Sequence, residues 1–231
     1  MSAPRSATVD QSGSADSAVA CERTAALNQT SRLPFTRVGR DVTVWSTAKI
    51  VGAEAISMGD AVIIDDFVLL FGGARTEIGS FVHIGPFSSI AGGGEFIMED
   101  FSGLSGGVRV YTGNEDYRGG CLTNPTVPFP YRIAQRSFVR INKHAIVGAN
   151  AVILPGVTIG EGTAVGANSL VTKDCEPWTV YFGSPAKPLK RRPKVRILEL
   201  EAQLRQDLYD ARGRYIPQMM RGALQSTKEP G

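Results

Sequence analysis

The chain has 231 residues, and its 25 Lys and Arg against 22 Asp and Glu give a formal net charge of +3 at pH 7. This near balance argues against a surface built as a whole for nucleic acid, and no apolar run is long enough to span a membrane, so neither partner is expected. The three cysteines, Cys21, Cys121 and Cys175, are widely spaced without a C-x-x-C pair, which argues against a disulfide framework or zinc site and favours a cytoplasmic location.

Residues 1–33 form the first segment. They are rich in Ser and Ala, and acidic residues interrupt them where a signal peptide would have a continuous apolar stretch. A segment with so few apolar side chains to bury does not offset the conformational entropy that it would lose on folding. We therefore predict that residues 1–33 are disordered.

Residues 34–192 carry a six-residue repeat, which is clearest between Ile141 and Glu176. An aliphatic residue opens each unit there, and a small or short residue follows four positions later. The openers are Ile141, Val147, Ile153, Ile159, Val165 and Val171. A period of six fits neither a helix nor an ordinary strand, and it predicts a parallel β-helix wound from hexapeptides.

The same repeat can be traced upstream in groups of three units, each spanning 18 residues, with one or two extra residues between groups. The predicted openers are Val38, Val44 and Ile50, then Met58, Ile64 and Leu70, then Ile78, Ile84 and Ile90, then Ile97, Gly103 and Arg109. Three units per coil predict a triangular prism of about six coils, with a small insertion at one corner. The alternative, a β-sandwich, would show turn signals every 8–12 residues.

The repeat stops between residues 112 and 137, where the sequence becomes polar and contains Pro125, Pro128 and Pro130. A long irregular excursion from a regular solenoid is either surface filler or a functional loop. Its position in the middle of an otherwise regular prism favours function.

Residues 193–231 follow the prism. Ile197, Leu200, Leu204 and Leu208 recur at helical spacing, while the polar face mixes acidic and basic residues. This pattern predicts an amphipathic α-helix that docks onto the prism or onto a neighbouring subunit. Beyond Pro217 we expect the chain to fray.

These features resemble the hexapeptide-repeat acyltransferases over about Val38 to Arg192. Three stretches carry the resemblance: the block from His144 to Lys173, the ending Phe182-Gly-Ser-Pro-Ala-Lys, and the loop stretch Leu-Thr-Asn-Pro-Thr-Val-Pro from Leu122 to Pro128. Within the family the chain is similar to the maltose and galactoside acetyltransferases and, more closely, to perosamine N-acetyltransferase.

The resemblance implies an all-β solenoid, specifically a left-handed parallel β-helix with a protruding loop and a C-terminal α-helix. It also implies a homotrimer, in which the loop arches over a cleft between subunits, and acetyl-CoA as the co-substrate. The function it implies is transfer of an acetyl group to a sugar.

The acceptor site departs from the family pattern at one position. In the maltose-type relatives a histidine acts as the base just after the strand ending Tyr-Thr, and Glu115 occupies the corresponding place here. Three interpretations stay open: Glu115 or Asp116 replaces the base, another residue supplies it, or the substrate needs no strong base. We predict a site containing His83, Asn114, Glu115 and Asp116.

The chain has only two histidines. His83 lies where maltose-type relatives carry an aromatic residue near the acceptor, so it is a candidate for the site, whereas His144 is expected to be structural. A metal site is not expected, since the zinc-dependent carbonic anhydrase version of this prism needs three imidazoles.

The missing histidine bears on the nature of the acceptor. A sugar hydroxyl needs a positioned base, whereas an amine is already partly neutral near pH 7. We therefore favour N-acetylation of a nucleotide-linked deoxyamino sugar for a surface glycan such as O-antigen, or for a glycosylated natural product. The alternatives are O-acetylation of a sugar or oligosaccharide and a non-catalytic scaffold subunit.

For coenzyme A, the resemblance implies three groups of residues. Ala149 and Ala167 match positions that contact pantetheine, Thr172 and Lys173 match residues near the adenine, and Lys187 and Lys190 match arginines that meet phosphates. Lysine keeps the charge of arginine but loses its bidentate geometry.

Overall fold

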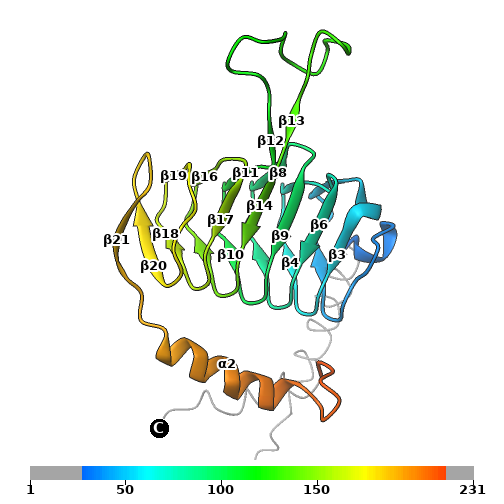
Figure 1. Cartoon of the computed structure of the whole chain (residues 1–231). Coiled ribbons are helices and arrows are strands. Elements are labelled where there is room, and N and C mark those ends of the chain that lie inside the picture. The colour runs from blue at the N-terminus through cyan, green and yellow to red at the C-terminus, as the bar shows by residue number, and fades with distance from the viewer. Residues whose placement is uncertain (1–27, 217–231) are drawn as a thin grey trace, which may run out of the picture.

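The computed structural model describes residues 28–216, and these form a triangular prism of three β-sheets with one long helix beside it (Figure 1). The prediction of a left-handed β-solenoid with a C-terminal helix is confirmed. The prediction of disorder in residues 1–33 and of a frayed tail falls mostly on residues outside the described range. No helix in that range is long and apolar enough to cross a membrane.

Each of the first five coils contributes one strand to each of three faces, and the last two coils contribute fewer. The first face contains β1 (Thr43–Val44), β4 (Ile63–Ile64), β7 (His83–Ile84), β10 (Gly103–Leu104), β15 (Ile146–Val147), β18 (Ala164–Val165), β20 (Thr179–Phe182) and β21 (Lys187–Arg191). The second contains β2 (Lys49–Val51), β5 (Leu69–Phe71), β8 (Ser89–Ala91), β11 (Arg109–Tyr111), β16 (Val152–Ile153) and β19 (Leu170–Val171). The third contains β3 (Ile56–Met58), β6 (Arg75–Ile78), β9 (Glu95–Met98), β14 (Phe138–Ile141) and β17 (Val157–Ile159). The sixth coil adds β18 and β19, and the seventh adds β20 alone.

All neighbouring strands on the three faces are parallel except the last pair on the first face, where β21 turns back antiparallel to β20. The parallel strands of the first face give seven coils, one more than the repeat predicted. The seventh coil is β20, which follows Pro177 and Trp178 and no longer keeps the six-residue pattern.

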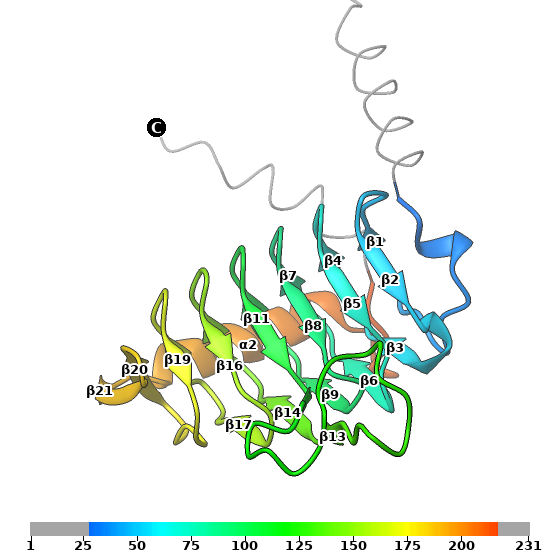
Figure 2. The same ribbon diagram turned by 90° about the horizontal axis from the view of Figure 1, so that it is seen from above.

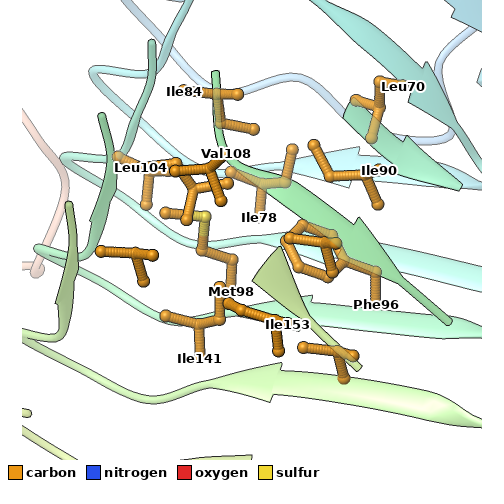
Figure 3. Packing of buried hydrophobic residues seen from close by; sticks show 14 of the residues in the cluster. Leu70, Ile78, Ile84, Ile90, Phe96, Met98, Leu104, Val108, Ile141 and Ile153 are labelled. Atoms are coloured by element: carbon orange, nitrogen blue, oxygen red, sulfur yellow. The ribbon is translucent and has the colours of Figure 1, made fainter. Parts of the chain in front are cut away.

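The core is a stack of inward side chains running the length of the prism. Figure 3 shows its middle part from close by. In the regular part, both the aliphatic opener and the small residue four later are buried, as Val147 and Ala151 illustrate. Openers stack directly on one another, since Leu104 pairs with Val147 and Val147 with Val165. Burying each such side chain is worth about 1.5–3 kcal/mol.

The predicted register of the fourth upstream group is wrong by one residue. The buried openers are Met98, Leu104 and Val110, in place of Ile97, Gly103 and Arg109. Strand β9 pairs with β6 so that Phe96 lies beside Thr76 and Met98 beside Ile78, and each coil here is therefore 20 residues long. Strand alternation turns Phe96 and Met98 inward and Ile97 outward.

The first upstream opener is also misplaced. Val38 is 37% exposed, and the row of inward openers begins at Val44, which is fully buried. Val38 precedes the first strand of the prism and has no coil beneath it to cover it.

The helix α2 (Val195–Leu208) runs along the corner between the third and first faces (Figure 2). The prediction that a helix docks onto the prism is confirmed, but the predicted apolar face is only partly the docking face: the buried residues are Glu201 and Leu208, while Leu200 is 46% exposed. Glu201 is its anchor: the carboxylate lies 2.7 Å from His144 Nε2 and 2.6 Å from Lys143 Nζ. Arg205, one turn on, donates to Glu201 at 2.6 Å and to Asp100 at 3.2 Å.

His144 is 6% exposed and stacks on Phe101, with ring centroids 5.3 Å apart. Its place in the prism wall under α2 agrees with the structural role expected from the sequence.

Candidate active site

The excursion predicted between residues 112 and 137 rises from the corner between the second and third faces (Figure 1). Its base is a short antiparallel pair, β12 (Gly113–Asn114) with β13 (Gln135–Arg136). Thr112 fixes this base to the prism, since its carbonyl accepts from the Ser137 N–H at 2.7 Å and its hydroxyl accepts from the Gly94 N–H at 3.0 Å.

Asp116 organises the first turn of the loop. Its carboxylate accepts the backbone N–H of Arg118 at 2.8 Å and that of Cys121 at 2.9 Å, and it also accepts from Gly120. The Arg118 N–H is the main cause that lowers the pKa of Asp116. Sequence reasoning placed Asp116 in the acceptor site, but these contacts give its carboxylate a loop-holding role.

A cleft of about 540 Å³ opens where the loop leaves the prism. Its floor is the outer surface of the second face, where the ends of β5, β8 and β11 place Phe71, Ala91 and Tyr111 in a row. The loop supplies the other wall, which carries the charged groups, and its lining residues are Gly113, Asn114, Glu115, Pro125, Arg132, Ala134 and Arg136. The predicted residues Asn114 and Glu115 thus lie in one cleft.

Within the cleft Glu115 is paired with Arg132. Arg132 Nε lies 3.0 and 2.9 Å from the two Glu115 oxygens, and its terminal nitrogen Nη2 makes a further contact. The hydrogen bond from Arg132 is the main cause that lowers the pKa of Glu115. Glu115 therefore stays ionised at neutral pH, where it can hold a cation but is a weak base.

Arg136 adds a second guanidinium to the cleft. It packs over Gly93, where a β-carbon would lie 3.4 Å from Nε. Among residues 28–216, no carboxylate forms an ion pair with Arg136. Two arginines against one glutamate make the cleft an anion-attracting site.

Sequence reasoning did not include Arg132, Arg136, Phe71 or Tyr111 in the site. The irregular loop carries no periodicity that would pair Arg132 with Glu115, 17 positions earlier. Phe71 and Tyr111 lie two coils apart, on either side of Ala91, and line the same cleft only because the coils stack.

His83 does not line this cleft. It lies on β7 in the first face, where its side chain is 54% exposed and its Nε2 lies 2.7 Å from a carboxylate oxygen of Asp65. Within one chain, His83 on the first face and Glu115 in the loop therefore do not line the same cleft.

The residues that the resemblance assigns to coenzyme A lie at the C-terminal end of the prism. Ala149 and Ala167 stack at the corner between the first and second faces, and the Asn168 N–H donates to the Ala149 carbonyl at 2.8 Å. Thr172 and Lys173 follow β19 at the next corner, between the second and third faces. Lys187 and Lys190 are exposed on the antiparallel strand β21.

Comparison with known proteins agrees with this architecture. The family model described as bacterial transferase hexapeptide (six repeats) matches residues 138–173. The dTDP-4-amino-4,6-dideoxy-D-glucose acyltransferase of Escherichia coli is 39% identical over 175 residues, which cover 75% of this chain and 91% of that protein. The chain is a hexapeptide-repeat acyltransferase.

Two further similarities fit this family. AntD, an N-acyltransferase from Bacillus cereus, has been solved in complex with dTDP and 3-hydroxybutyryl-CoA; it is 36% identical, with a TM-score of 0.71 over 76% of this chain and 93% of AntD. A probable macrolide acetyltransferase of Lysinibacillus sphaericus is 36% identical over 50% of this chain and 62% of its own. The co-substrate of the acyltransferase is an acyl-coenzyme A, and the alternative of a non-catalytic scaffold is set aside.

Proposed function

We propose that this acyltransferase moves the acetyl group of acetyl-CoA to the amino group of a nucleotide-linked deoxyamino sugar. The observation that carries the proposal is the cleft at the loop base, which joins a carboxylate, two guanidinium groups and exposed aromatic rings. A carboxylate binds an ammonium, guanidinium groups bind a diphosphate, and aromatic rings stack on a nucleobase. The E. coli relative is named for a sugar of this kind, and a mutant of AntD has been solved with dTDP-4-amino-4,6-dideoxyglucose and coenzyme A.

The chemistry requires the neutral amine. Its lone pair forms the new C–N bond with the thioester carbonyl carbon, the C–S bond breaks, and the sulfur of coenzyme A leaves with the electron pair. The amine then loses its extra proton to water or to the leaving thiolate. Because the lowered pKa of Glu115 makes it a weak base, its role is to hold and orient the sugar ammonium, which gives its first proton to water and so becomes the neutral amine that attacks.

The decisive experiment measures thiol release from acetyl-CoA with matched acceptors. A dTDP-linked 4-amino-4,6-dideoxy sugar should react, its 4-hydroxy counterpart should not, and a free amino sugar without the nucleotide should react far more slowly. Equal rates with the hydroxyl sugar or with maltose would overturn the proposal.

O-acetylation of a neutral oligosaccharide is the second candidate. It would account for the fold and the coenzyme, but a neutral acceptor gives no reason for Arg132 and Arg136 to converge in the cleft. The two guanidinium groups therefore favour the nucleotide-linked acceptor.

We further propose a homotrimer that works in the cytoplasm, where nucleotide sugars and acetyl-CoA coexist, and supplies a surface glycan or natural product. The support for assembly is the loop, whose Tyr117 and Phe129 are 88% and 83% exposed in the single chain. Large exposed aromatic side chains gathered on one segment mark a contact surface. A neighbouring subunit under the loop would also bring its His83 towards the cleft, and this is the place we propose for that residue.

A prediction follows for the coenzyme. Changing Lys187 and Lys190 together to Ala should raise the KM for acetyl-CoA by roughly tenfold, the size expected for lost charge-assisted hydrogen bonds, with a smaller effect on kcat. Lys173, at a different corner of the last coils, should be tested as a single change to Ala. Lys49→Ala, at the other end of the prism, is the control, and an unchanged KM in the double variant would contradict the phosphate role.

A further inference from the structure

The pairing of Glu115 with Arg132 conflicts with what the proposed acceptor needs. A nucleotide-linked amino sugar carries a diphosphate, which seeks a guanidinium, and an ammonium, which seeks a carboxylate. In the structure the Arg132 guanidinium and the Glu115 carboxylate, which both line the cleft, are paired with each other. Nε and Nη2 of Arg132 and the Glu115 oxygens that they contact become available to the substrate when the pair opens.

Solvent reaches the pair, which helps it to open. The side chains of Arg132 and Glu115 are 23% and 29% exposed, so water contacts both and screens part of their attraction. Arg132 also belongs to the loop and not to the rigid prism. Arg136 stands beside the pair without a carboxylate of its own among the described residues, so an incoming anion first meets an unpaired cation.

We propose that the Glu115–Arg132 pair is a latch which the diphosphate of the nucleotide sugar opens. The diphosphate binds Arg132, with Arg136 beside it, and the released Glu115 carboxylate pairs with the sugar ammonium. One exchange of partners thus couples recognition of the nucleotide to orientation of the amine. This inference rests on the proposed function and adds to it an order of events and a role for Arg132.

The proposal makes an unusual prediction for a ligand that has the diphosphate but no amine. When dTDP binds to the wild type, the diphosphate replaces Glu115 as the partner of Arg132, and Glu115 is left without a cation. Glu115→Gln leaves Arg132 free, so dTDP should bind roughly fivefold more tightly, as expected from the loss of a competing, partly screened ion pair. For the complete amino sugar the same variant should lose kcat/KM, because the ammonium has no carboxylate.

The experiment is calorimetric titration of the full chain with dTDP, in wild type, Glu115→Gln, Arg132→Gln and the double variant. Arg132→Gln should weaken binding. The double variant separates two explanations of tighter binding. If Glu115→Gln acts only by removing a nearby negative charge, it tightens dTDP binding whether or not Arg132 is present. If it acts by freeing Arg132, it no longer tightens dTDP binding when Arg132 is absent. Equal tightening in both backgrounds would overturn the latch.

Glu77→Gln is the matched control. Glu77 pairs with Arg75 at 2.6 Å on the third face, outside the cleft, so this variant removes the same charge and a similar surface pair. Its dTDP affinity should equal that of wild type. If Glu115→Gln instead weakens dTDP binding, the pair is a brace of the loop and the proposal fails.

Failure of the proposed function would look different. In that case the wild type would neither bind dTDP nor acetylate any nucleotide-linked amino sugar. A second outcome would contradict the latch and leave the proposed function standing. In it the wild type binds dTDP and transfers the acetyl group, but Glu115→Gln has the same dTDP affinity as the wild type.

Discussion

Replacing residues 115–134 by the dipeptide Asn-Gly should abolish acetyl transfer and leave the prism folded. Asn114 and Gln135 are paired across the base of the loop, so a two-residue turn closes the hairpin without moving either strand. The variant loses Glu115 and Arg132 and opens the cleft to water. Loss of substrate positioning of this kind costs at least about 10³-fold in rate.

Three measurements check this expectation. Transfer is followed by thiol release, folding by thermal denaturation, and assembly by sedimentation, where the wild type should be a trimer and the variant should assemble more weakly. A double change of Tyr117 and Phe129 to Ser is the control that keeps the cleft and removes only the exposed rings. Substantial transfer by the loopless variant would show that the acceptor binds elsewhere.

Changing Glu201 to Ala should have the largest effect on stability. The substitution leaves His144 and Lys143 facing Arg205 without the carboxylate between them, at a site where Glu201 itself is nearly buried. Removing one partner of a fully buried ionic cluster costs about 3–5 kcal/mol, and because Lys143 and Arg205 are 31% and 39% exposed we expect a loss of about 2–3 kcal/mol here. The melting temperature should fall by roughly 4–12 °C, and hydrogen exchange should show α2 losing protection first.

The control for this variant is Glu199→Ala on the same helix. Glu199 is exposed and its pair with Arg196 spans 3.3 Å, so its removal should change the melting temperature by little. Similar losses for the two variants would mean that helix propensity, and not the buried cluster, holds α2 in place.

The pH dependence of the Glu201 contribution has a definite sign. Burial alone would raise the pKa of Glu201, but hydrogen bonds from Lys143, Arg205 and His144 outweigh burial and lower the pKa to about 2. Because the pKa in the folded state lies below the ordinary value of 4.5, the stabilisation is complete above pH 4.5 and is lost as the pH falls towards 2. The difference in stability between wild type and Glu201→Ala should therefore shrink over that window.

The sequence by itself determined the solenoid. Stacked coils bury one aliphatic residue per hexapeptide, so aliphatic residues recur in the sequence with a period of six. It also indicated the loop, the docking helix and the structural role of His144. The predicted register was wrong at Ile97. Either Ile97 or Met98 could open the hexapeptide, and only the pairing of β9 with β6 decided between them.

Only the tertiary structure decided the contents of the cleft. Phe71 and Tyr111 come from coils 40 residues apart, and Arg132 reaches Glu115 through the fold of an irregular loop. Such contacts depend on where stacked coils and a non-repeating segment meet in space. A one-dimensional pattern records what each coil buries, and it holds no information on which exposed side chains face one another across a corner.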